Sequence, residues 1–261
     1  MATTYPNMPE KHAHPSVTGP GDFLDAAQAA GWDPGPLPAG VVFTYSPLIT
    51  HHLDQSERFQ EHKALAPSNA RFFVSDEGGE RVGVSCLAPG APAMATQLQN
   101  LIHLGVGRFA SVGTAGAITE SIDPGQVVVL SAAVRDEGVS HHFLPPARYA
   151  EADPDLTERL RAAIADCGYE TLTGRTWTTA VPFRMTADEI EEYAADDVLT
   201  TEMEAAALFA VASVLGARAA SAVVVTDVTT TAGRIREDWK AAPAPLLAVL
   251  HAAVETVRQR A

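Results

Sequence analysis

Three carboxylates flank one helix and the strand that follows it, within residues 201–228. Glu202 and Glu204 stand where the chain enters the helix, and Asp227 stands at the end of the strand. The carboxyl ends of strands in an open α/β sheet form the edge where ligands usually bind. A carboxylate at such an edge can hold a ligand or transfer a proton to it. We therefore expect Glu204 and Asp227 to face one crevice.

The helix and the strand that must position these carboxylates are marked by their apolar patterns. Apolar residues recur at three- and four-residue intervals from Ala205 to Leu215, which predicts a helix with one buried stripe, and Gly216 is suited to end it. Residues 219–226 form a nearly unbroken run of small and β-branched residues. Such a run is typical of a central strand that is covered on both faces.

Strands and helices alternate along the rest of the chain, which predicts one α/β domain. We expect strands at residues 41–44, 70–75, 82–87, 108–112, 126–133 and 171–179. We expect helices at residues 22–30, 47–59, 93–104, 155–167 and 239–259. Residues 1–20 are rich in Pro, His and polar residues without periodicity, so we expect a flexible N-terminal arm before a single domain over 21–261.

The composition argues against several classes of protein. A formal charge of −14 over 261 residues is unsuited to nonspecific binding of nucleic acid or of an anionic membrane. Cys86 and Cys167 are too few for a disulfide framework. The chain has no apolar run of transmembrane length, and its polar N-terminus lacks the hydrophobic segment of a signal peptide. We therefore expect a cytoplasmic protein.

Four segments carry a resemblance to a known family. Residues 201–207, TEMEAAA, and 223–227, VVVTD, resemble the signature pair of the nucleoside phosphorylase family, which includes purine nucleoside and uridine phosphorylases and related nucleosidases. Residues 112–118, VGTAGAI, resemble the family's glycine-rich turn after a central strand. Residues 135–146, RDEGVSHHFLPP, resemble a segment of its uridine-phosphorylase-like members. The segments also occur in the family's order.

The resemblance implies a three-layer α/β/α domain with a mixed central sheet, and cleavage of the N-glycosidic bond of a nucleoside. Such cleavage passes through an oxocarbenium-like state while the departing base gains negative charge. By resemblance, Glu204 grips the sugar hydroxyls and Asp227 gives a proton to the base, and an Asp at this place accompanies purine substrates. The resemblance also implies no cofactor, phosphate as co-substrate, and a homo-oligomer, either a dimer or a hexamer.

Further residues are placed at the nucleoside by the same resemblance. They are Met203 against the sugar, Phe183 stacked on the base, Arg184 at a base carbonyl, and His141 or His142 at the nucleoside. Glu202 alternates direction with Met203 if the segment is extended, so we expect it in a supporting role. Each residue also has a simpler interpretation. Met203 could be a core methionine, and Phe183 and Arg184 could pack or point to solvent. The histidine could lie at the surface, and Glu202 could be a solvated carboxylate. For Asp227 the alternative is a cap of the loop after the strand.

The chain departs from the family at the phosphate site. Phosphorylases carry a Gly-Asp-Pro-x-Arg motif after the first strand and a second Arg before the glycine-rich turn. Residues 45–49, YSPLI, stand at the first place and Ser111 at the second. The remaining donors are neutral: Ser111, Thr114 and the backbone N–H groups from Gly113 onward. Arg71 of a neighbouring subunit could supply a charge.

Three classes of function remain open. Phosphorolysis is favoured because Thr114 and the glycine-rich segment persist. A nucleosidase would use water in place of phosphate, but nucleosidases place a Glu after the first strand, and Ser46 cannot serve as that base. The third class is a nucleoside-binding protein that has lost catalysis. A metal site is not expected, because the adjacent pairs at 51–52 and 141–142 are poorly placed to ligate one ion.

Overall fold

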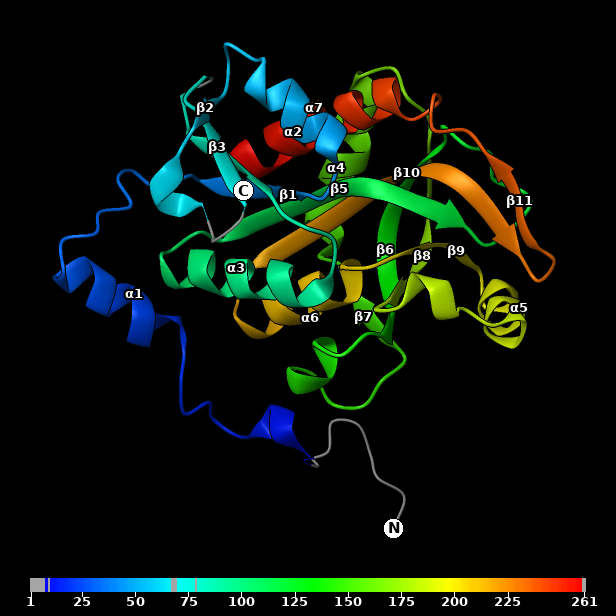
Figure 1. Cartoon of the computed structure of the whole chain (residues 1–261), viewed down its shortest axis with the longest axis horizontal. Helices are drawn as coiled ribbons and strands as arrows, with labels where there is room; N and C mark the ends of the chain where they lie inside the picture. Colours follow the sequence, from blue (N-terminus) through cyan, green and yellow to red (C-terminus); the bar gives the residue numbers. More distant parts are fainter. Residues whose placement is uncertain (1–7, 9, 67–69, 78, 260–261) are drawn as a thin grey trace.

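The chain folds around one mixed β-sheet with helices on both of its faces (Figure 1). The structure is a computed structural model that describes residues 8, 10–66, 70–77 and 79–259. Within these residues, eleven strands form a sheet in the order β11-β10-β6-β8-β9-β5-β1-β4-β3-β2, and β7 pairs with β6. The predicted α/β class with a mixed sheet is confirmed.

The elements alternate along the chain much as the sequence pattern predicts. The strands are β1 (Gly40–Thr44), β2 (Gln60–Glu61), β3 (Arg71–Ser75), β4 (Val82–Cys86), β5 (Arg108–Ala117), β6 (Val127–Asp136), β7 (Tyr149–Glu151), β8 (Thr171–Thr179), β9 (Val198–Glu202), β10 (Arg218–Thr230) and β11 (Gly233–Glu237). The helices are α1 (Pro20–Ala29), α2 (Pro47–Asp54), α3 (Ala91–His103), α4 (Pro154–Asp166), α5 (Ala187–Ala195), α6 (Ala205–Val214) and α7 (Pro243–Arg258). Short 3₁₀ turns are η1 (Lys11–Ala13), η2 (Lys63–Leu65), η3 (Ser140–His142) and η4 (Pro182–Arg184). Among the described helices, none is long and apolar enough to cross a membrane.

Part of the sheet closes on itself. β10 pairs in parallel with β5 and antiparallel with β6. β9 pairs antiparallel with the end of β5 and in parallel with β8, and β8 pairs in parallel with β6. The strands β5, β9, β8, β6 and β10 therefore form a closed ring, from which β1, β4, β3 and β2 extend as an open sheet.

A hydrophobic core lies on each face of the sheet. In Figure 1, α3 and α6 lie on one side of β1, β5 and β10, whereas α2 and α7 lie on the other. Phe43 of β1 and Phe109 of β5 stack in the core under α3 and α6, with ring centroids 5.9 Å apart. Their neighbours Val42 and Ala110 belong to the opposite core, because successive strand residues point to opposite faces.

Helix α6 is buried on all sides rather than along one stripe. Every residue from Ala205 to Ala212 is buried, so the predicted single apolar face is wrong. The reason is that α6 packs against α3 and also against several strands, and its small alanine side chains allow this close approach. Gly216 follows the helix with a φ of 73°, the left-handed conformation predicted for it.

The glycine-rich segment is a strand, not the predicted turn. Gly113 and Gly116 lie within β5, which continues to Ala117. The register of β1 with β5 ends at Val112, and the register of β9 with β5 begins at Gly116. Residues 113–115 therefore border a gap in the pairing between β1 and β9, which we call the β5 gap. The turn prediction fails because β10, distant in sequence, pairs along this segment and holds it extended.

Other differences concern short elements. The predicted helix over 47–59 ends at Asp54, and the sequence pattern missed β2, β7, α5, β9 and β11. The expected arm over 1–20 includes residues 1–7 and 9, which lie outside the described residues. Within its described part, η1 forms beside η3, and α1 begins at Pro20.

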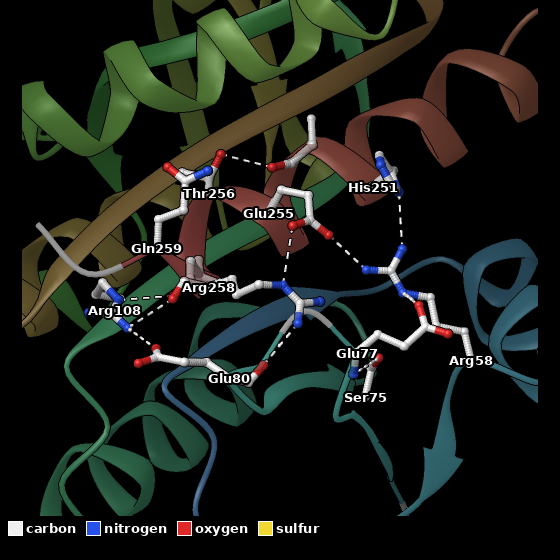
Figure 2. A network of polar contacts seen from close by, with 12 residues as sticks. Arg58, Ser75, Glu77, Glu80, Arg108, His251, Glu255, Thr256, Arg258 and Gln259 are labelled. Carbon is white, nitrogen blue, oxygen red and sulfur yellow. Dashed lines mark hydrogen bonds and ion pairs between the residues drawn. The ribbon is translucent and has the colours of Figure 1, made fainter.

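Charged side chains pair at the end of the sheet where β4 and β5 begin (Figure 2). Arg258 of α7 contacts the Glu255 carboxylate at 3.2 Å and donates to the Glu80 carbonyl at 2.9 Å. Arg108, the first residue of β5, lies 3.6 Å from the Glu80 carboxylate. Arg58 contacts Glu255 at 2.7 Å. This network ties the last helix to the starts of two strands.

Candidate functional site

β9, which leads into the two glutamates, and β10, which carries Asp227, both pair with Gly116 of β5. Gly116 pairs with Thr201 of β9 on one side and with Asp227 of β10 on the other. A Cβ atom at Gly116 would lie 3.2 Å from the Asp227 Oδ2 and 3.5 Å from the Thr201 Cγ2. Gly116 thus leaves room for the Asp227 carboxylate beside β9.

The Glu202 carboxylate caps the N-terminus of α6. Its Oε2 accepts hydrogen bonds from the backbone N–H groups of Glu204 and Ala205, both at 2.7 Å. Its Oε1 accepts from the Thr178 hydroxyl at 2.5 Å, and that hydroxyl accepts from the Ala206 N–H at 2.9 Å. These bonds satisfy N–H groups that a helix start leaves without partners. Glu202 therefore fixes the backbone that carries Glu204.

Glu204 joins the starts of two helices. Its side chain is buried, and its Oε1 accepts a hydrogen bond from the Gly90 N–H at 2.5 Å. Gly90 precedes α3 and has a φ of 123°, a conformation that favours glycine. The carboxylate is therefore held between the N-terminal ends of α3 and α6, where helix dipoles favour negative charge.

Burial raises the pKa of both glutamates above the usual range for glutamate. For Glu202, hydrogen bonds from Thr178 and from two backbone N–H groups offset part of this effect. For Glu204, the charge of Glu202 adds to the effect of burial. The donors in the hydrogen bonds described above are all neutral. A ligand that supplies positive charge or hydroxyl donors would therefore be stabilised here.

Asp227 is oriented by three donors. Its Oδ1 accepts from the Thr226 hydroxyl at 3.1 Å, and its Oδ2 accepts from the Thr229 hydroxyl at 3.4 Å. The Arg234 Nε lies 3.5 Å from Oδ2, because β11 folds back along β10 and brings this residue to the carboxylate. The Asp227 side chain keeps 13% of its surface exposed. Part of this carboxylate is therefore accessible to a ligand.

The side of the β5 gap towards β1 is lined by neutral groups. Tyr45 follows β1, and its ring lies 3.5 Å from where a Cβ atom of Gly113 would stand. Thr114 is half-buried. Ser111 lies deeper in the strand, is buried, and places its hydroxyl 2.8 Å from the Ser221 hydroxyl. Its expected role as a donor to phosphate stays a prediction.

Arg71 is neutralised by its own chain. Its Nη2 lies 2.6 Å from the Asp54 Oδ1, and its Nε lies 2.8 Å from the Glu61 Oε1. It lines a surface pocket together with Tyr45 and Ser46. The sequence suggested that this guanidinium binds phosphate in a neighbouring subunit. To do so, it would have to leave its two carboxylate partners.

The remaining predicted site residues lie in less enclosed positions. Phe183, on η4, is 99% exposed, so its ring extends into solvent, and Arg184 beside it is also exposed. Met203 is partly buried between the two glutamates. His141, on η3, places its Nε2 2.8 Å from the Arg135 carbonyl oxygen. The structure thus pairs β9, which ends at Glu202, and Asp227 of β10 with the same residue of β5, whereas it leaves the predicted base-stacking ring exposed.

Sequence reasoning missed Gly90, Thr178 and Arg234. Gly90 precedes a Pro-containing helix start, a signal that could have identified it. Thr178 reaches Glu202 through the parallel pairing of β8 with β9, and Arg234 reaches Asp227 through a hairpin. These two contacts depend on strand pairing, for which the sequence around each residue gives no local signal.

Comparison with known proteins covers most of this chain. A model of the phosphorylase superfamily matches residues 41–255. Uridine phosphorylase of Escherichia coli (strain K12) is 33% identical, with 64% of this chain and 70% of that protein covered. Uridine phosphorylase of Haemophilus influenzae is 32% identical, with 58% and 67% covered. A DeoD-type purine nucleoside phosphorylase of Bacillus cereus is 29% identical, with 74% and 83% covered.

The matched region contains every strand of the sheet except the first residue of β1, and it includes Tyr45, Glu204 and Asp227. The relatives named above are nucleoside phosphorylases, which are enzymes. The chain belongs to the phosphorylase superfamily.

Proposed function

We propose that this protein cleaves the N-glycosidic bond of a nucleoside and transfers the sugar to phosphate, which yields a free base and a pentose 1-phosphate. The observation that carries the proposal is that Thr201 of β9, three residues before Glu204, and Asp227 of β10 both pair with Gly116 of β5, with Glu204 buried and Asp227 partly open. The names of the relatives, uridine and purine nucleoside phosphorylases, support this class of reaction.

Glu204 is assigned to the sugar. Its Oε1 is held by the Gly90 N–H, which leaves Oε2 to accept hydrogen bonds from ribose hydroxyls. An oriented carboxylate also stabilises the positive charge that develops on the sugar as the bond to the base breaks. Glu202 supports this role by fixing the backbone at Glu204, and Met203 is assigned to the apolar face of the sugar.

Asp227 is assigned to the base. A carboxyl group there gives a proton to a ring nitrogen of the leaving base, which removes the charge that the base gains. Arg234 and the two threonine hydroxyls orient the carboxyl group for this transfer. Phe183 and Arg184, exposed in the structure, are assigned to close over the base, and His141 to contact the nucleoside.

The acceptor is assigned to the β5 gap. The backbone of residues 113–115 borders the gap, and Thr114 adds a hydroxyl donor. Ser111 stays assigned to this side as predicted, although its hydroxyl first has to leave Ser221. Neutral hydrogen bonds are roughly half as strong as charge-assisted ones, so we expect a high KM for phosphate.

We also propose that the active form is a homo-oligomer, as the resemblance to the family implies. Light scattering at micromolar concentration is the test. A dimer or hexamer supports the proposal, whereas a monomer that turns over nucleosides contradicts it.

A product assay tests the proposed reaction. The protein is incubated with a panel of purine nucleosides and uridine, with and without phosphate, and the free base is quantified by chromatography. We expect base release that rises with phosphate concentration. Base release at the same rate without phosphate would identify a nucleosidase. No release from any member of the panel would leave a nucleoside-binding protein.

A further inference from the structure

Tyr45 occupies a distinctive position beside the β5 gap. It is the first residue after β1, and its ring packs against Gly113 with a distance of 3.5 Å to the position that a Cβ atom would take. It also packs against the core under α3 and α6, which includes Ala205, the residue next to Glu204. The distance to Gly113 is an ordinary van der Waals distance, so the ring lies directly against the β5 segment that borders the gap.

The hydroxyl of Tyr45 is buried and has no hydrogen-bond partner among the described residues. Burial and then the charges of Glu204 and Glu202 raise its pKa well above that of a free tyrosine. The group is therefore a neutral phenol that can donate one hydrogen bond. A buried donor without a partner is unfavourable, and a ligand oxygen that accepts from it removes that cost.

The positions of Asp227 and Tyr45 along β5 match the two sides of a nucleoside. Asp227 lies beside Gly116 and Tyr45 beside Gly113, three residues away in the same strand, which is roughly 10 Å. A sugar held by Glu204 between them would present its base to Asp227 and its opposite face to Tyr45. An acceptor that displaces the base in line attacks C1′ from the face opposite the base, which in this placement is the side of Tyr45.

We propose that the Tyr45 hydroxyl donates a hydrogen bond to an oxygen of the bound acceptor, and that its ring forms the wall of the acceptor site beside Gly113. This inference rests on the proposed function, because it takes the sugar to lie at Glu204 and the base at Asp227. Inorganic phosphate is the acceptor of that reaction. Tyr45 is then a binding residue for phosphate, and the site uses a phenol donor together with Thr114 and the backbone.

The test is Tyr45→Phe, which removes the hydroxyl and keeps the ring. We expect the phosphate KM to rise about tenfold, since the lost bond is to a charged acceptor, while the nucleoside KM changes by less than about twofold. The melting temperature should stay the same or rise, because an unpartnered buried hydroxyl is removed. Tyr169→Phe is the matched control, because Tyr169 packs against the core on the opposite face and should change neither KM.

Calorimetric titration with inorganic phosphate, without nucleoside, separates this inference from the proposed reaction. Weaker phosphate binding by Tyr45→Phe than by the parent supports the inference even if no nucleoside of the panel is cleaved. Equal binding by parent and variant overturns it even if nucleosides are cleaved by phosphorolysis. A raised nucleoside KM with an unchanged phosphate KM would place the hydroxyl at the sugar and would also overturn it. A parent that binds no phosphate overturns it as well.

Discussion

The two ends of the sheet differ in how their charged side chains are partnered: ion pairs form at one end, and neutral donors bind carboxyl groups at the other. Where β4 and β5 begin, Arg258 and Glu255 pair with each other, and Arg58 and Arg108 extend the network (Figure 2). Around the end of β5, Glu202 and Glu204 are bound by neutral donors, and their pKa values are raised. We infer that the first end contributes to stability, whereas the second holds carboxyl groups whose ionised form a ligand can stabilise. Substitutions at the two ends should therefore affect different properties.

The largest effect is expected from Glu204→Gln. The amide keeps the volume of the side chain but cannot ionise, so it cannot supply the negative charge that supports a positive charge developing on the sugar. We expect kcat to fall by roughly 10²- to 10³-fold, with the circular dichroism spectrum unchanged. Glu170→Gln, at an exposed position before β8, is the matched control. Activity within about threefold of the parent would refute the sugar-site assignment.

Asp227→Asn should give the next largest effect. It removes the proton donor but keeps hydrogen-bonding groups for Thr226 and Thr229. We expect kcat to fall about a hundredfold for purine nucleosides, and less for a nucleoside whose base leaves without protonation. Asp166→Asn, at an exposed site in α4, controls for the loss of one surface carboxylate. Equal losses on both kinds of substrate would indicate that Asp227 is structural.

The opposite end of the sheet should respond in stability rather than in rate. Glu255→Gln leaves the buried guanidinium of Arg258 without its carboxylate. We expect the free energy of unfolding to fall by about 1 to 3 kcal/mol, less than for a fully buried pair because Glu255 is partly exposed. Urea denaturation measures this change, and kcat should stay the same. Glu191→Gln, on the exposed surface of α5, is the control. A loss of kcat with unchanged stability would contradict the contrast between the two ends.

A smaller effect is expected in the pH dependence of stability. Burial, followed by the charge of Glu202, raises the pKa of Glu204 to about 8 in the folded protein. A raised folded pKa means that the contribution of this group to stability is present below its unfolded pKa and is lost as pH rises through the folded pKa. The amide of Glu204→Gln does not titrate.

The stability of the parent relative to Glu204→Gln should therefore fall by on the order of 1 kcal/mol between about pH 5 and about pH 8. Urea denaturation at both pH values measures the difference. Comparison of the parent with Glu170→Gln shows what an exposed glutamate contributes. A constant difference between the parent and Glu204→Gln would mean that Glu204 is not strained by burial.

The parts of the fold that local patterns determine could be predicted from the sequence. β8 has the predicted bounds, and Gly216 has the left-handed conformation expected after a helix. Local patterns gave wrong predictions where pairing with a strand distant in sequence determines the backbone conformation. Gly113 and Gly116 are typical turn residues, but pairing with β10 and β9 holds them in a strand. The short run of β9 carries no strong period, so its place in the ring could not be predicted.

The sequence could predict those site residues whose place follows from the helix or strand that carries them. Asp227 and Thr201, three residues before Glu204, pair with the same residue of β5, and the shared crevice expected for Glu204 and Asp227 stays a prediction. The groups that orient them could not be predicted, because Gly90 contacts Glu204 across 114 residues of sequence. Tyr45 was noticed as a departure from a family motif, but its contact with Gly113 depends on the end of the β1 register.

The central claim is that the edge beside Glu204 and Asp227 transfers a nucleoside's sugar to phosphate. Phosphorus NMR of the protein with a cleaved nucleoside and inorganic phosphate tests it most directly, because it observes the acceptor itself. We predict a new pentose 1-phosphate resonance that grows in step with released base, and its absence with Glu204→Gln. Released base together with an unchanged inorganic phosphate signal would contradict the account.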